Sequence, residues 1–141
     1  MAKYAIGFVR VSLGIVFLWF GALKFFPDAS PAELIAQRTM NKLTMGIIPC
    51  SLSYMILAVV ESLLGLLLIG NLFQKVVTAL AVGHILMTFS PMVFFPSELF
   101  SKAWVPNLLG QYIIKNLVLL SALVLINHKF CYSDKETCIT S

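Results

Sequence analysis

Four long apolar stretches limit the folds that this 141-residue chain can adopt. They cover residues 5–26, 51–70, 73–95 and 110–127. Each has about 20 residues, the length at which an α-helix crosses the hydrocarbon core of a bilayer. Hydrophobic residues make up 60% of the sequence and charged residues 11%, which excludes an ordinary soluble domain. We therefore predict an all-α fold, an integral membrane four-helix bundle of residues 1–128 followed by a polar tail of residues 129–141.

The first loop carries a helix signal. Ser30-Pro31-Ala32-Glu33 has the form of a capping box with proline at the first helical position. This pattern predicts a short interfacial helix that ends near Leu43. An ordinary solvated loop is the alternative.

The second and third spans are separated only by residues 71–75, so they should form an antiparallel hairpin. Pro91 lies late in the third span and should kink it, because proline donates no backbone hydrogen bond. Trp104, in the loop that follows, stands where membrane proteins place interfacial aromatic side chains.

Small residues repeat along the first span. Gly7, Gly14 and Gly21 recur every seven positions and therefore share one helix face, where a second helix can approach closely. Arg10 and Lys24 each follow one of these glycines by three residues. We expect both cations to lie beside the helix contact and to be directed at protein rather than at lipid.

Glu61 is the one carboxylate in the second span. An unpaired carboxylate in hydrocarbon costs at least a few kcal/mol, so it needs a proton, a cation or a hydrogen-bond donor. The other spans supply Arg10, Lys24, His84 and Lys115. We predict that these groups converge inside the bundle, with Glu61 and Lys115 as the best ion pair.

A structural explanation of these groups competes with a functional one. Buried ionisable residues can pair merely to fix which helices are neighbours, and Arg10 and Lys24 can extend their charges toward the bilayer surface. His84 has no second His or Cys at ligand spacing, so we predict no metal or haem site, and a hydrogen-bonded packing role is its alternative.

The remaining signals exclude several classes of site. Cys50 stands alone, either as an inert buried thiol or as a reactive one. Cys131 and Cys138 have six residues between them, a spacing of neither a redox pair nor a zinc site. The net charge of +4 is not concentrated in any stretch, so we predict no nucleic-acid partner. The sequence contains no nucleotide-binding or hydrolase motif.

The distribution of basic residues favours both termini in the cytoplasm. With that orientation the inner side carries Lys3, Lys75, Lys129 and Lys135. The outer side carries Arg38, Lys42 and Lys102. Basic residues prefer the cytoplasmic side of a membrane protein, and this orientation places four of them inside and three outside.

Four segments in this order resemble the DoxX-like superfamily, closest to its YkgB-type branch. They are RVSLGIVFLWFGALKFF (residues 10–26), ESLLGLLLIG (61–70), HILMTFSPMVFFP (84–96) and GQYIIKNLVLLSALVL (110–125). The resemblance implies a four-helix protein of the bacterial inner membrane. Relatives include a subunit linked to thiosulfate:quinone oxidation, components of oxidative-stress or reactive-chlorine resistance, and distant eukaryotic chaperone-like proteins. The matching polar positions are Arg10, Lys24, Glu61, His84, Gln111, Lys115 and Asn116.

The polar groups and the resemblance together predict a redox- or oxidative-stress-associated subunit that binds a quinone-like amphiphile between its helices. Its catalytic residues would be Glu61 and His84, and its ligand-binding residues Lys24, Gln111, Lys115, Asn116 and Arg10. The partners would be the lipid bilayer, a quinone or other lipid-soluble ligand, and a further protein subunit. A quinone is the one candidate cofactor, and whether the chain is itself catalytic stays open. The alternatives are a non-catalytic membrane scaffold and, third, a small transporter.

Overall fold

The computed structural model describes residues 2–26, 29–30, 32–102 and 104–139, with side chains between residues 4 and 128 of these ranges. Within them, four helical segments are long and apolar enough to cross a membrane. They are Tyr4–Leu23, Cys50–Gly70, Gln74–Phe94 and Leu108–His128. The structure confirms the predicted all-α membrane bundle.

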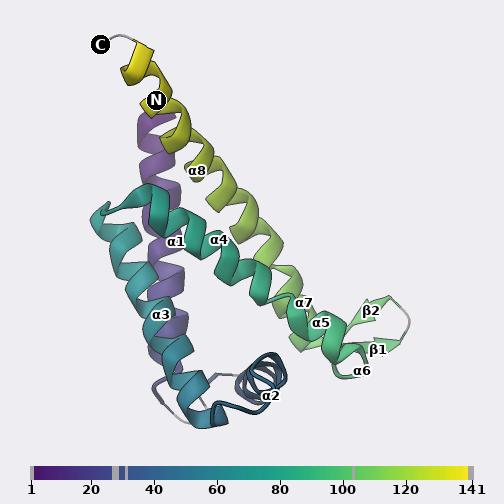
Figure 1. The fold of residues 1–141 in the computed structure, drawn as a ribbon. Helices are drawn as coiled ribbons and strands as arrows, with labels where there is room; N and C mark the ends of the chain where they lie inside the picture. Colours follow the sequence, from purple (N-terminus) through teal and green to yellow (C-terminus); the bar gives the residue numbers. More distant parts are fainter. Residues whose placement is uncertain (1, 27–28, 31, 103, 140–141) are drawn as a thin grey trace.

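The first and third helices form the closest pair in the molecule (Figure 1). Helix α1 spans Ala2–Leu23 and helix α3 spans Cys50–Gly70. A Cβ added at Gly14 would lie 2.6 Å from Ile69 Cγ1, and one added at Gly21 would lie 2.6 Å from the backbone nitrogen of Ser62. These two glycines therefore permit the close approach that their spacing predicts. A Cβ at Gly7 would meet nothing within 4 Å, so Gly7 lies outside the contact.

Helix α4 (Gln74–Met87) follows α3 after a turn of three residues, and helix α8 (Asn116–Ile139) packs against α4. Asn71 makes the turn by adopting a left-handed conformation with φ 57°. The predicted hairpin of the second and third spans is therefore present. In Figure 1 the α4 and α8 pair crosses the α1 and α3 pair at an angle, and the two pairs spread apart toward the end that holds helix α2.

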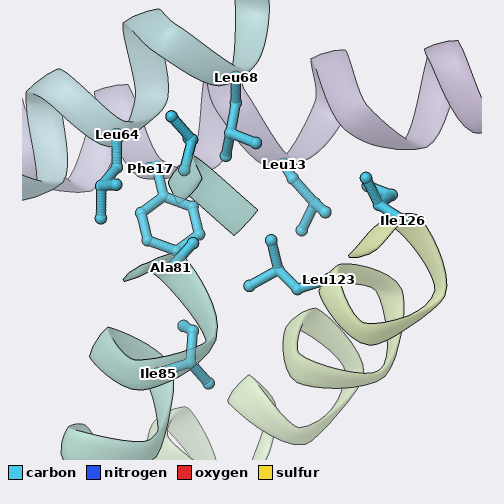
Figure 2. Close-up of a cluster of buried hydrophobic side chains, with 9 residues drawn as sticks. Leu13, Phe17, Leu64, Leu68, Ala81, Ile85, Leu123 and Ile126 are labelled. Atoms are coloured by element: carbon cyan, nitrogen blue, oxygen red, sulfur yellow. The ribbon is translucent and has the colours of Figure 1, made fainter. Parts of the chain in front are cut away.

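All four spans contribute to the main apolar core (Figure 2). Leu13 and Phe17 of α1 meet Leu64 and Leu68 of α3 on one side. Ala81 and Ile85 of α4 with Leu123 and Ile126 of α8 complete the core. Because lipid is as apolar as these side chains, their close packing rather than their transfer from water stabilises the bundle.

Pro91 breaks the third span, as predicted. Helix α4 ends at Met87, and helix α5 (Ser90–Phe94) begins after Thr88 and Phe89. A proline cannot donate to the carbonyl four residues before it, which here is Met87. The Ser90 hydroxyl donates to that carbonyl oxygen at 2.7 Å and replaces the missing bond.

The last span is also broken, which we did not predict. Helix α7 (Leu108–Ile114) stops at Lys115, and α8 continues from Asn116. Asn107 caps α7 by accepting a hydrogen bond from the backbone nitrogen of Gly110 at 2.9 Å. The α8 backbone is helical as far as Ile139, through the segment that the sequence assigns to a polar tail. Cys131 and Cys138 lie outside the described side chains.

Helix α2 (Glu33–Leu43) is the predicted helix of the first loop, and it lies at one end of the bundle (Figure 1). The predicted capping box is wrong: no side chain caps the helix, and Ser30 contributes only its carbonyl oxygen, 3.1 Å from the backbone nitrogen of Glu33. Pro31 lies outside the described residues. Arg38 pairs with Glu98 at 2.6 Å and ties α2 to the second loop.

The second loop forms its own small structure. Helix α6 (Pro96–Leu99) leads into an antiparallel hairpin of strands β1 (Phe100–Lys102) and β2 (Val105–Pro106). Trp104 lies at the hairpin tip, 94% exposed, with φ 66°. An exposed indole at this end of the bundle suits the interfacial position predicted for it.

The α1–α3 contact leaves no room for a side chain at Gly65. A Cβ there would lie 2.5 Å from Leu18 N and 2.7 Å from Gly14 O, which are backbone atoms that cannot rotate away. Gly65→Ala should therefore destabilise the protein by about 1–3 kcal/mol. Unfolding of the purified protein in mixed micelles with increasing dodecyl sulfate measures this loss.

Gly83→Ala is the matched control, because a Cβ at Gly83 would meet nothing within 4 Å. Its unfolding midpoint should equal or exceed that of the wild type, since alanine is the better helix former. Equal midpoints for the Gly65 and Gly83 variants would contradict the close contact.

Candidate functional site

Glu61 is buried in the middle of α3, with 7% of its surface exposed. One carboxylate oxygen, Oε2, accepts a hydrogen bond from the Lys24 ammonium. The other, Oε1, lies 2.8 Å from His84 Nε2. The acid thus meets polar groups from two other spans, as predicted, but its cation is Lys24 and not Lys115. We call Lys24, Glu61 and His84 the central triad.

Local structure explains this choice of partner. Gly21 brings α1 against Glu61 and Ser62, and Lys24 follows one turn later, just beyond the end of α1. The Lys24 ammonium also donates to the Phe20 carbonyl at 3.4 Å. The Phe17 ring packs against the His84 ring, with centroids 5.8 Å apart. Lys115 comes from the α7–α8 break, where no described carboxylate lies within ion-pair distance of it.

A cavity of about 400 Å³ lies beside the central triad, between the two spreading helix pairs. Helix α2 contributes Ile35, Ala36, Thr39 and Met40 to one wall. The lining is mainly apolar, and its ionisable or amide side chains are Lys24, Glu61, His84, Tyr112, Lys115 and Asn116. An apolar chamber with a few polar groups is the usual form of a site for an amphiphilic small molecule.

Three predicted ligand-binding residues differ in their relation to this cavity. Asn116 lines it and donates from Nδ2 to Thr88 Oγ1 at 2.9 Å. Lys115 lines it and is exposed. Gln111 does not line it: its Nε2 donates to the Pro106 carbonyl at 3.3 Å on the exposed side.

Arg10 lies away from the cavity, near the other end of the α1–α3 pair. Its guanidinium donates to the carbonyl oxygens of Leu68 and Ile69, the latter at 3.0 Å. These are among the last carbonyls of α3, which have no partner within the helix. The structure therefore gives Arg10 a contact directed at protein, as expected for its position beside the glycine face. The prediction that Arg10 converges with the other ionisable groups is wrong, because it lies near the C-terminal end of α3 and does not line the cavity.

The sequence prediction missed two parts of the site. Tyr112 lines the cavity and packs edge-on against Phe20, with centroids 5.6 Å apart. The signal was present, because Tyr112 and Asn116 are four residues apart and share a helix face. Helix α2 was expected at the interface but not as a cavity wall, and no pattern in its sequence indicates the chamber beneath it.

The central triad is suited to holding and exchanging protons. When Nε2 of neutral His84 donates to the Glu61 carboxylate, Nδ1 has a lone pair and can accept a proton from a molecule in the cavity. Lys24 compensates the carboxylate charge meanwhile. No group of three or more His, Cys, Asp or Glu residues lies together among the described residues, so this part of the chain offers no metal site.

Removal of Lys24 alone should destabilise the protein more than removal of both charges of the Lys24–Glu61 pair. Lys24→Met leaves a buried carboxylate with only His84 as partner, which should destabilise the protein by about 3–5 kcal/mol. Adding Glu61→Gln removes the orphaned charge, so the double variant should recover much of that loss. Unfolding in mixed micelles measures both values.

Arg38→Met is the control, because Arg38 and Glu98 form an exposed pair with side chains 59% and 41% accessible. It should cost less than about 1 kcal/mol. A single Lys24 variant as stable as the wild type would show that Glu61 is not charged in the folded bundle.

Comparison with known proteins identifies a family. The DoxX family model matches residues 5–95, well over half of the chain, and this range contains the whole central triad. It ends before α7, so Tyr112, Lys115 and Asn116 lie outside the match. No curated protein and no solved structure matches the chain. With its four apolar spans and this match, the chain belongs to the DoxX family and is a multi-pass membrane protein.

Proposed function

We propose that this protein is the membrane subunit of a quinone-linked redox system and binds a quinone-like amphiphile in the cavity. The observation that carries the proposal is the position of a hydrogen-bonded Glu61–His84 pair on the wall of an apolar chamber within the membrane spans. A quinone needs both features, an apolar site for its tail and ring and proton donors near its carbonyl oxygens.

The chemistry assigned to the chain is proton transfer. Reduction of a quinone to a quinol takes up two electrons and two protons, and the electrons would come from a partner protein. When His84 carries a proton on each ring nitrogen, Nδ1 can pass its proton to a carbonyl oxygen while Nε2 keeps its hydrogen bond to Glu61 Oε1, 2.8 Å away. A proton taken up from the aqueous phase would restore the charged ring. Tyr112, Lys115 and Asn116 are further hydrogen-bond donors on the lining.

The proposed setting is the bacterial inner membrane, with both termini in the cytoplasm. The charge bias of the loops supports this orientation. The start of α1, the C-terminal half of α8 and the α3–α4 turn lie toward one end of the bundle, and α2 and the β1–β2 hairpin lie at the other, which such an orientation requires (Figure 1). We assign the chain to the YkgB-type branch, linked to reactive-chlorine resistance, on the combined resemblance of residues 10–26, 61–70, 84–96 and 110–125.

A variant that fills the cavity tests the proposal without disturbing any charge. Ala36 lines the cavity from α2, so Ala36→Phe should lower the affinity for decylubiquinone by about tenfold or more. Leu34→Phe is the control on the same helix, since Leu34 is 77% exposed and is not part of the lining. Binding to protein in lipid nanodiscs and mass spectrometry of co-extracted lipids provide the two measurements.

Wild-type protein that neither binds decylubiquinone nor carries a co-extracted quinone would overturn the proposal. Equal affinities in the Ala36 and Leu34 variants would place the quinone elsewhere.

A scaffold function is the second candidate, favoured by the way Glu61 joins three spans through Lys24 and His84. The two functions differ in the folded double variant Lys24→Met with Glu61→Gln. A scaffold should keep its cellular function, measured as restored oxidant resistance in a deletion strain. A proton-exchanging subunit should lose it, although the protein reaches the membrane in normal amounts.

A further inference from the structure

Lys115 is a cation within a membrane span that has no anionic partner among the described residues. It lies seven residues into the span Leu108–His128. Among the described residues, Glu61 is paired with Lys24 and His84, and Glu98 is paired with Arg38. Lys115 takes part in neither arrangement. An ammonium at this depth needs a counter-charge or an extended path to the bilayer surface.

The cavity therefore has an unbalanced charge. Within its lining the charges of Lys24 and Glu61 cancel, whereas that of Lys115 remains. Asn116 follows Lys115 and lines the same space, and its Nδ2 is held by Thr88 Oγ1, which also lines the cavity. An amide and an ammonium that line the same cavity can both donate to one acidic head group.

We propose that Lys115 makes the cavity select amphiphiles whose head carries one negative charge, the shared feature of a long-chain carboxylate and of a quinone-like ring with an acidic hydroxyl. The inference rests on the proposed function, since it takes the cavity to be a site for an amphiphile. The inference specifies the charge of the ligand head and the residue that binds it. The negative head supplies the counter-charge that Lys115 lacks, and the tail occupies the apolar part of the chamber.

Two matched pairs of probes test the selection in nanodiscs of uncharged phosphatidylcholine. Oleate is compared with oleyl alcohol, and an alkyl hydroxynaphthoquinone with its methyl ether, so that each pair differs in head charge at constant tail. The wild type should bind the acidic member of each pair more tightly by about tenfold or more, as expected for a hydrogen bond between charged groups. Selection of only one acidic probe would tell the carboxylate from the acidic quinone as the ligand.

Lys115→Met should abolish the preference for the acidic member of each pair, because the ammonium is the group that distinguishes the charged head from the neutral one. Lys115→Arg should retain the preference. Lys102→Met is the surface control, since Lys102 lies on β1 outside the cavity lining, and it should behave as the wild type. If Lys115→Met does not fold, Lys115→Gln takes its place with the same expected result.

Equal binding of acidic and neutral probes by the wild type, or a preference that survives in the Lys115→Met protein, would overturn the inference and leave Lys115 as a lysine that only extends to the bilayer surface. If the neutral quinone still binds in that case, the proposed function stands without this inference. If no probe of either kind binds, the proposed function fails as well.

Discussion

The neutralisation of Glu61 by Lys24 and His84 is the interaction on which the rest of the bundle depends. A carboxylate in a water-poor interior is tolerated only with donors on both oxygens, and here the two donors come from different spans. The contacts of Glu61 with Lys24 and His84 fix α1 and α4 against α3 at one level of the membrane. It also leaves the acid at the wall of a chamber rather than in a closed core, which is why a structural contact and a candidate site coincide.

The sequence predicted the architecture well because membrane spans are determined by length and hydropathy. The four spans, the hairpin, the break at Pro91 and the helix after the first span all follow from local signals. The break at Lys115 does not, because no proline or glycine stands there. The capping box is the opposite case, a local signal that the structure does not use. Its pattern fits Ser30 to Glu33, but α2 begins after Ala32 without a side-chain cap.

The sequence predicted which residues form the candidate site better than it predicted which of them pair with each other. Glu61, Lys24 and His84 were identified because polar groups are conspicuous in apolar spans, yet the favoured partner of Glu61 was Lys115. The deciding factor is the approach of α1 and α3 at Gly21 and Gly65, which carries Lys24 to the acid. Helix depth alone could not separate Lys24 from Lys115, since both lie toward the same end of the bundle. Which helices touch is a tertiary property, and apolar spans offer little pattern to encode it.

The two cationic anchors of α1 have a mechanical consequence. Arg10 grips the last carbonyls of α3, and Lys24 grips Glu61 two turns earlier in that helix, so α1 and α3 are pinned to each other at separate levels. Two such contacts oppose sliding and twisting of α1 against α3, so the pair should behave as one rigid unit. The other half of the molecule is interrupted twice, after Met87 and at Lys115. These two interruptions adjoin each other, since Asn116 donates to Thr88 across them at 2.9 Å. Bending of the α4–α8 half at this level would change the width of the chamber while α1 and α3 keep their positions relative to each other.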